Sequence, residues 1–291
     1  MRAIISLLIT AILCINLSGC EKQATATDIV ATTLPVYEFT SRLCSGTDLG
    51  VTRLITENVS CLHDYTLKTS QMRSVENAKV IVMSGSGLEE FMTDAVPATA
   101  NVIDASLEIS LVCSKENHEH SDSHHHDEDP HIWLSPANAK QMAETIYKAL
   151  VTIYPDCADV MGENLATLIA DINRLDNYAK EQLANLSCRE LITFHDGFSY
   201  MADAFGLSIV HAIEEESGSE ASAAELMDLI SIIREHNLDV IFTERSGSSA
   251  AAEIISAEID TSIYQLDMAI SGDSYFDAMY HNINTLKEAL E

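Results

Sequence analysis

Short apolar runs alternate with amphipathic segments along most of the chain, and the alternation occurs twice. In the first half, apolar runs predict strands at 29–33, 50–56, 78–83 and 101–104, with helices at 35–43 and 88–95. In the second half, strands are expected at 191–194, 208–212, 240–243 and 262–266, with helices at 200–205, 221–236, 249–258 and from 275 to the end. Strands and helices alternating at this spacing predict an α/β fold with parallel sheets covered by helices.

Two helical patterns join these halves. The first begins at Ser135-Pro136, where a capping residue precedes a proline at the first helical position, and runs to about 153. The second spans about 156–185 and repeats leucine and isoleucine at helical spacing. Either both are core helices of one domain, or the second is a rigid strut between two lobes; we favour the strut. The expected domains are an N-terminal lobe at 20–155, a linking helix at 156–186 and a C-terminal lobe at 187–291.

The first nineteen residues have the order of a secretory signal. Arg2 is followed by an apolar run over 3–17, and the run ends at Leu17-Ser18-Gly19-Cys20. This ending is similar to a bacterial lipobox, in which cleavage precedes a cysteine that becomes lipidated, here Cys20. An uncleaved membrane anchor is the alternative. Both place the rest of the chain outside the cytoplasm, attached to a membrane, and no other stretch approaches the roughly 20 apolar residues of a membrane span.

Composition and charge narrow the function. Apolar residues make up 47% of the chain, which supplies a sizeable core. Acidic residues outnumber basic ones 45 to 16, giving a net charge of −29, so nucleic acid is excluded as a partner and a cation is favoured. Beyond Cys14 and Cys20, five cysteines without a CxxC pair predict mostly free, buried thiols, and Cys157 and Cys188 are expected too far apart to be bridged.

Three histidines and one aspartate follow or precede predicted elements at positions suited to a ligand site. His195 and Asp267 directly follow the strands at 191–194 and 262–266, His63 comes after the second strand, and His131 precedes the first linking helix. Ligands of open α/β sheets bind outside the carboxyl ends of strands, so these side chains are placed to form a tetrahedral shell between the lobes, a set that suits Zn²⁺. Taken singly, a histidine at a strand end is more often a hydrogen-bonded loop residue.

A second histidine group falls within 117–129. It contains His118, His120, His124, His125 and His126 among acidic and polar residues. The segment has nothing apolar to bury, so it is expected to be a loop that binds Zn²⁺ or related ions weakly and repeatedly, with a solvated spacer as the alternative.

Several motifs occur in a fixed order. They are His131-Ile132-Trp133-Leu134-Ser135-Pro136, Phe194-His195-Asp196-Gly197-Phe198-Ser199-Tyr200 and Gln265-Leu266-Asp267. In this order they resemble the metal-binding lipoproteins of zinc and manganese ABC importers, the cluster A-I solute-binding proteins. Leu62-His63-Asp64-Tyr65 and the histidine-rich run favour the zinc branch, and the resemblance extends through the closing helix with Tyr275, Asn282, Leu286 and Leu290. It implies two similar α/β lobes joined by one long rigid helix, with the metal in the cleft.

The resemblance implies four ligands, His63, His131, His195 and Asp267. The chain departs from the family pattern at Leu62, where a proline is usual, and at 65–69, where an acidic-proline stretch is usual. The fourth ligand varies in the family, so water or a loop group is the alternative to Asp267. Glu244 matches a strand-end acid of the family and is expected to be a structural partner at the cleft rather than a ligand.

The implied function is that of an extracytoplasmic, lipid-anchored receptor. It captures Zn²⁺ and passes the ion to an ABC permease with its ATPase complex, acts as a monomer and has no catalytic residues. Mn²⁺ is the less favoured cargo, because manganese importers of the family tend to carry a carboxylate at the position of His195. A secreted zinc hydrolase with three histidines and a bound water is a second alternative, for which Asp64 or Asp196 would be the base. An adhesin role is neither supported nor excluded.

Overall fold

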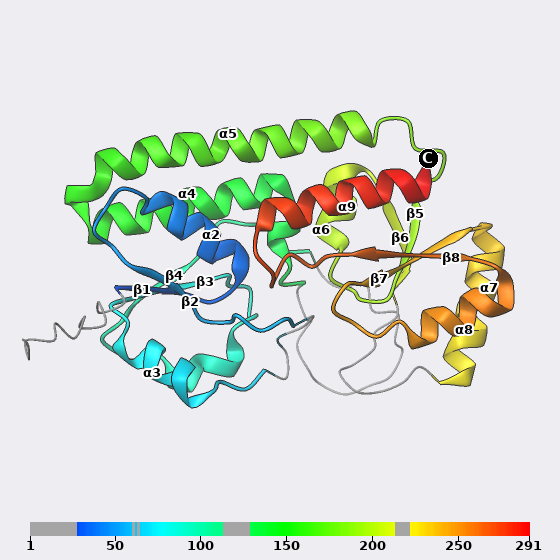
Figure 1. The fold of residues 1–291 in the computed structure, drawn as a ribbon, viewed down its shortest axis with the longest axis horizontal. Coiled ribbons are helices and arrows are strands. Elements are labelled where there is room, and N and C mark those ends of the chain that lie inside the picture. Colours follow the sequence, from blue (N-terminus) through cyan, green and yellow to red (C-terminus); the bar gives the residue numbers. More distant parts are fainter. Residues whose placement is uncertain (1–27, 60–61, 63–64, 113–128, 213–221) are drawn as a thin grey trace, which may run out of the picture.

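The computed structural model describes residues 28–59, 62, 65–112, 129–212 and 222–291, which form two α/β lobes bridged by a long helix (Figure 1). The predicted signal peptide, Cys20, His63 and the five histidines of the 117–129 run lie outside the described residues. Within the described part of the chain, no helix is long and apolar enough to cross a membrane.

The N-terminal lobe contains a parallel sheet of apolar strands. Its strands are β1 (Ile29–Ala31), β2 (Val51–Arg53), β3 (Val80–Met83) and β4 (Asn101–Asp104), in the order β2-β1-β3-β4. The helix α2 (Leu34–Leu43) covers one face and α3 (Thr69–Asn77) the other, as Figure 1 shows. The sequence pattern missed α3 because only Gln71 and Val75 of this helix are buried. The helix predicted at 88–95 is wrong in type: Glu90–Ala95 is a 3₁₀ helix, η1, with only Met92 buried.

The C-terminal lobe repeats this topology. Its strands are β5 (Glu190–Thr193), β6 (Ser208–Ala212), β7 (Val240–Glu244) and β8 (Ser262–Leu266), all parallel and in the equivalent order β6-β5-β7-β8. The helices are α6 (Ser199–Phe205), α7 (Ala223–His236), α8 (Ala250–Ile259) and α9 (Tyr275–Leu290). Every predicted strand is therefore present, and the prediction of two similar lobes with parallel sheets is confirmed.

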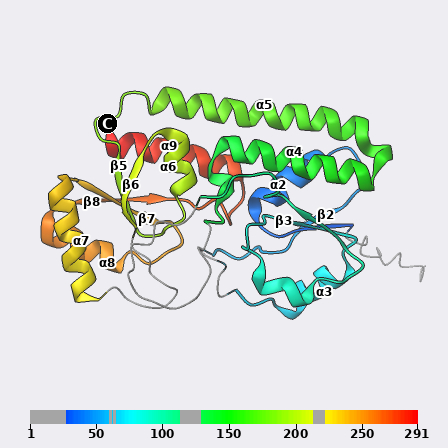
Figure 2. The same ribbon diagram turned by 180° about the vertical axis from the view of Figure 1, so that it is seen from behind.

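Two helices lie between the two sheets along the chain. They are α4 (Pro136–Ile153), preceded by the 3₁₀ turn η2 (Ile132–Leu134), and α5 (Ala158–Gln182), preceded by η3 (Pro155–Cys157). The 25 residues of α5 span about 37 Å at 1.5 Å per residue. α5 packs on α2 and α4 of the first lobe and on α9 of the second, and both views show it running along one side of the molecule (Figures 1 and 2). The predicted strut is confirmed. Ser135 is the N-cap of α4, but its hydroxyl makes no capping hydrogen bond.

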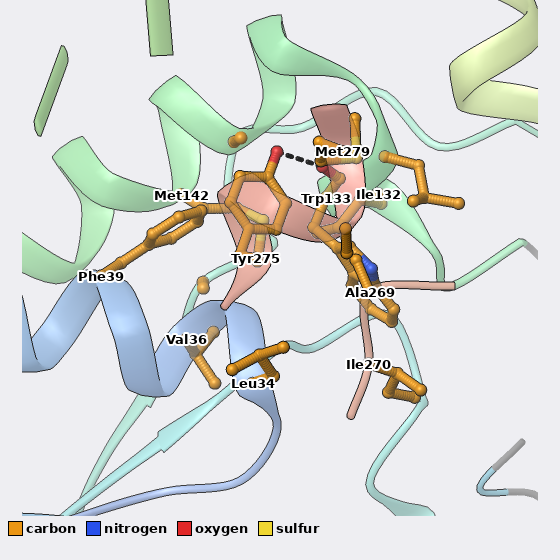
Figure 3. Close-up of a cluster of buried hydrophobic side chains, with 14 of the residues drawn as sticks. Leu34, Val36, Phe39, Ile132, Trp133, Met142, Ala269, Ile270, Tyr275 and Met279 are labelled. Carbon is orange, nitrogen blue, oxygen red and sulfur yellow. Dashed lines mark hydrogen bonds between the residues drawn. The ribbon is translucent and has the colours of Figure 1, made fainter. Parts of the chain in front are cut away.

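The larger of two hydrophobic clusters contains residues of both lobes. Trp133 is fully buried and donates from Nε1 to the Met268 carbonyl at 2.7 Å. The Tyr275 hydroxyl donates to the Trp133 carbonyl at 2.8 Å (Figure 3). The Phe39 ring meets Tyr275 edge-on at 5.0 Å between centroids. These contacts join η2, α2 and α9, so the residues beside η2 have fixed positions relative to the second lobe.

The described cysteines are free thiols. Cys44 is buried, and burial raises the pKa of its thiol to about 12. Cys157 and Cys188 are half-buried and stand near opposite ends of α5. The prediction of free thiols is confirmed for these three, and the prediction of full burial holds for Cys44 alone.

Candidate metal centre

His131 is held rigidly just before η2. Its side chain is almost fully buried, and its Nδ1 lies 2.8 Å from Asp129 Oδ1, the same oxygen that accepts the His131 backbone N–H at 2.9 Å. A neutral imidazole that donates from Nδ1 carries its lone pair on Nε2. The Nε2 atom of His131 is buried and has no hydrogen-bond partner among the described residues. It is therefore available to a ligand.

Strand register places His195 beside Glu244. Thr193 of β5 is paired with Phe242 of β7, so two residues further on His195 lies alongside Glu244. The Nδ1 atom of His195 is 3.2 Å from Glu244 Oε1, and the Glu244 side chain is only 6% exposed. The Thr193 hydroxyl donates to the His195 carbonyl at 2.9 Å and holds the turn after the strand. Glu244 is thus the buried carboxylate partner of His195.

The two imidazoles meet across the lobes. The ring centroids of His131 and His195 are 5.1 Å apart with an interplanar angle of 83°. Gly197 lies against both rings, since a Cβ atom at this position would fall 2.7 Å from His195 Cδ2 and 2.8 Å from His131 Nδ1. The glycine is needed here for close approach of the backbone to the histidine pair.

Asp267 is fixed at the end of β8 by α9. Both polar atoms of the Asn282 side-chain amide bind the Asp267 backbone: Oδ1 accepts the Asp267 N–H and Nδ2 donates to the Asp267 carbonyl, each at 2.7 Å. The carboxylate accepts the Ala269 N–H on Oδ1 at 2.8 Å and pairs through Oδ2 with Arg245 Nη1 at 3.2 Å. Asp267 and Glu244 line the same small polar hollow, together with Val59, Arg245, Ser246, Met268, Ile270 and Ser271.

The structure brings together part of the predicted set. His131 and His195 are adjacent, whereas Asp267 is engaged with Arg245, and His63 lies outside the described residues. Among the residues described, no three His, Cys, Asp or Glu side chains are grouped closely enough to hold a metal ion. The described part of the centre is a histidine pair, with Asp267 fixed in a neighbouring hollow.

Asp129 corrects the expected extent of the histidine-rich loop. The sequence assigned 117–129 to a segment with nothing to bury, yet Asp129 is 1% exposed, and its N–H donates to the Val112 carbonyl at 3.1 Å. The burial is explained by its contacts with His131, whose backbone N–H and Nδ1 both lie within hydrogen-bond distance of Asp129 Oδ1. An acid two residues before a candidate histidine ligand was the available signal, and the acidic surroundings concealed it.

A buried carboxylate also lies at the carboxyl ends of β1 and β3. Glu89 accepts from the Thr32 hydroxyl at 2.6 Å and from the backbone N–H groups of Ser84 and Gly85 at 2.7 and 3.0 Å. Burial raises the pKa of Glu89 to about 7, and the hydrogen bonds only partly offset this effect. The turn at 84–87 therefore binds a carboxylate of its own chain.

The donor chemistry of the pair suits a borderline-soft divalent cation. Imidazole nitrogen is a good ligand for Zn²⁺, and a carboxylate behind each imidazole orients the ring. Asp129 and Glu244 supply this support to His131 and His195 respectively. The geometry is that of two imidazoles from different lobes, each oriented by its own carboxylate.

Comparison with known proteins identifies relatives. Residues 29–289 match the family model described as zinc-uptake complex component A, periplasmic (ZnuA). The chain is 28% identical over 307 residues to the zinc-binding lipoprotein AdcA of Streptococcus pneumoniae, covering 99% of this chain but 61% of that relative's length. A crystal structure of ZnuA is 28% identical with a TM-score of 0.79, covering 90% of this chain and 99% of that one. The solute-binding protein FpvC of Pseudomonas aeruginosa in complex with Mn²⁺ shares the fold, at 23% identity and a TM-score of 0.77, over 90% of this chain and 97% of that one.

Proposed function

We propose that this chain, which belongs to the ZnuA family of periplasmic zinc-uptake components, captures Zn²⁺ in the cleft between its lobes. The matching family model describes a zinc-uptake component, which supports a receptor rather than the zinc hydrolase. The proposal extends to the route of the ion. The protein acts outside the cytoplasm as a monomer anchored through lipid on Cys20, and it delivers Zn²⁺ to an ABC permease and its ATPase complex.

The histidine pair is the observation that carries the proposal. His131 comes from the first lobe and His195 from the second, their rings lie 5.1 Å apart, and a buried carboxylate supports each one. The buried Nε2 atom of His131 faces no partner in the described protein, which is costly unless a ligand occupies it. An ion bound to both rings would bridge the lobes.

His63 and Asp267 complete the proposed shell. Asp267 is already fixed by Asn282 at the end of β8, and its approach to the ion requires release from Arg245. His118, His120, His124, His125 and His126 are proposed as a weaker, separate group that gathers the ion. Zn²⁺ is favoured over Mn²⁺ because three imidazoles suit zinc, which also stands higher in the affinity order of divalent metals.

Metal titration of matched histidine variants tests the proposal. His131→Ala and His195→Ala should each lower zinc affinity at least tenfold in competition with a chelator. His236→Ala is the matched control, because His236 Nδ1 also pairs with a carboxylate, Glu190 at 2.8 Å, but lies on exposed α7. X-ray absorption should show imidazole ligation of zinc bound to the wild-type protein. Unchanged affinity in both cleft variants would show that the pair does not bind the ion.

A further inference from the structure

β7 lies between β5 and β8, and its end supplies a charged partner to each neighbour. Glu244, the last residue of the strand, pairs with His195 after β5. The next residue, Arg245, pairs with Asp267 after β8, because Glu244 is in register with Leu266. The two proposed ligands of the second lobe therefore have their partners at the same turn: His195 is paired with the carboxylate of Glu244, and Asp267 with the guanidinium of Arg245.

The backbone of this turn is fixed, but the Arg245 side chain is not. The Arg245 N–H donates to the Leu266 carbonyl at 2.9 Å, and the Gly247 N–H returns to the Glu244 carbonyl at 3.3 Å. Ser246 donates from its hydroxyl to Asn58 Oδ1 of the first lobe at 2.8 Å. By contrast, the Arg245 side chain is 52% exposed and reaches Asp267 only through Nη1 at 3.2 Å. Its guanidinium can rotate into solvent without moving the turn.

Asp267, unlike the Arg245 side chain, is held by several hydrogen bonds. Asn282 holds its backbone on both sides, and the Ala269 N–H occupies Oδ1. Oδ2 is the oxygen that contacts Arg245. A metal ion that takes this oxygen from the side of Arg245 would replace the guanidinium, because the Asp267 backbone is held in place while the arginine side chain can turn into solvent.

We propose that Arg245 is a displaceable counter-ion, which neutralises Asp267 in the metal-free protein and leaves when a divalent cation binds. The inference rests on the proposed function, in which Asp267 is a ligand. A cation that enters the cleft takes the place of the Arg245 guanidinium beside Asp267. When the cation leaves, the guanidinium returns to the carboxylate. Arg245 therefore acts as a positioning residue that lowers the affinity for the ion and assists its release.

Removal of the positive charge should tighten zinc binding. An ion pair at this exposure contributes little, so Arg245→Gln should lower the zinc dissociation constant about two- to fivefold. Arg245→Lys keeps the charge and should restore the wild-type value. Arg174→Gln is the matched control, since Arg174 pairs with an aspartate, Asp171, on the surface of α5 away from the cleft. Affinities are measured by chelator competition on the full chain.

The double variant separates this inference from the proposed function. In an Asp267→Asn background, Arg245→Gln should have no effect on zinc affinity, because the guanidinium no longer competes for a carboxylate. Equal or weaker zinc binding by Arg245→Gln alone would overturn the inference, as would the same tightening in the Asp267→Asn background. The histidine variants decide separately whether the cleft captures zinc, so the inference about Arg245 can fail while the proposed function stands.

Discussion

Gly197 offers a sharp test of the histidine pair, because an alanine there would intrude on both rings. The added Cβ would lie 2.5 Å from Met268 Cε, 2.7 Å from His195 Cδ2 and 2.8 Å from His131 Nδ1. The end of the methionine side chain can move at little cost. The imidazoles cannot, because Asp129 holds one and Glu244 holds the other.

The magnitude follows from these contacts. Forcing one methyl group into a packed site costs about 1–3 kcal/mol of folding stability. Disturbing the orientation of metal-binding histidines typically costs ten- to a hundredfold in metal affinity. Gly197→Ala should therefore lower the free energy of unfolding by about 1–3 kcal/mol and weaken zinc binding at least tenfold.

The assay compares this variant with a glycine in the linking helix. At Gly162 of α5 an added Cβ meets only the Tyr147 hydroxyl, at 3.4 Å, so Gly162→Ala should be neutral or stabilise the helix by up to about 1 kcal/mol. Denaturant unfolding gives the stability of both variants without metal, and chelator competition gives their zinc affinity. If Gly197→Ala matches wild type in both measurements, the described packing of the two rings is refuted.

Three further predictions follow from the site and its surroundings. Deletion of 117–128 should abolish only weak additional zinc binding, whereas Asp129→Asn should weaken zinc binding at the tight site about ten- to a hundredfold. Equilibrium dialysis, which counts the bound zinc ions, distinguishes these results. Loss of the tight site on deletion would place a ligand in the loop. His195→Glu should weaken zinc binding and narrow the preference over manganese, and an unchanged ratio of the two affinities in a direct competition would contradict the role of His195 in selectivity. Because the pKa of Glu89 is raised to about 7, the folded protein binds a proton at this group more tightly than the unfolded chain does. The contribution of Glu89 to folding stability is therefore fully present below about pH 4.5 and is lost as pH rises through about 7. Glu89→Gln should flatten this decline, which is on the order of 3 kcal/mol, in unfolding curves recorded from pH 5 to 8, and an equal slope in both proteins would rule out Glu89 as its source.

The fold was largely predictable because the strands are short, apolar and bounded by turns. The eight predicted strands are present, and three of them, β4, β6 and β8, have the predicted limits. The failures have local causes. α3 buries too few apolar residues to show a periodic pattern, and 88–95 is too short a segment to distinguish an α-helix from a 3₁₀ turn.

The site was predictable where function follows directly from a strand end. His195 and Asp267 are the first or second residues after β5 and β8, so chain position alone indicates the edge on which they lie. Their partners depend on register between strands that are distant in the sequence. Glu244 was inferred only through resemblance, and Arg245 was missed because nothing local indicates that it faces Asp267. Asp129 was missed because its acidic neighbours made it look like part of a solvated loop.

The two faces of β7 pack in different hydrophobic clusters, and this difference affects local unfolding of the helices outside the strand. Phe242 packs into the core that spans both lobes, whereas Ile241 belongs to a smaller cluster beneath α7 and α8, which also contains Ile192, Leu229, Ile233 and Ile255. Regions with few buried apolar contacts exchange their amide hydrogens through local openings well below the cost of global unfolding. Amides of α7 and α8 should accordingly exchange sooner than those of α4 and α5. Each such opening would free one side of the strand that holds Glu244 and Arg245, so slow fluctuations of the outer helices would reach the cleft without any movement of one lobe against the other.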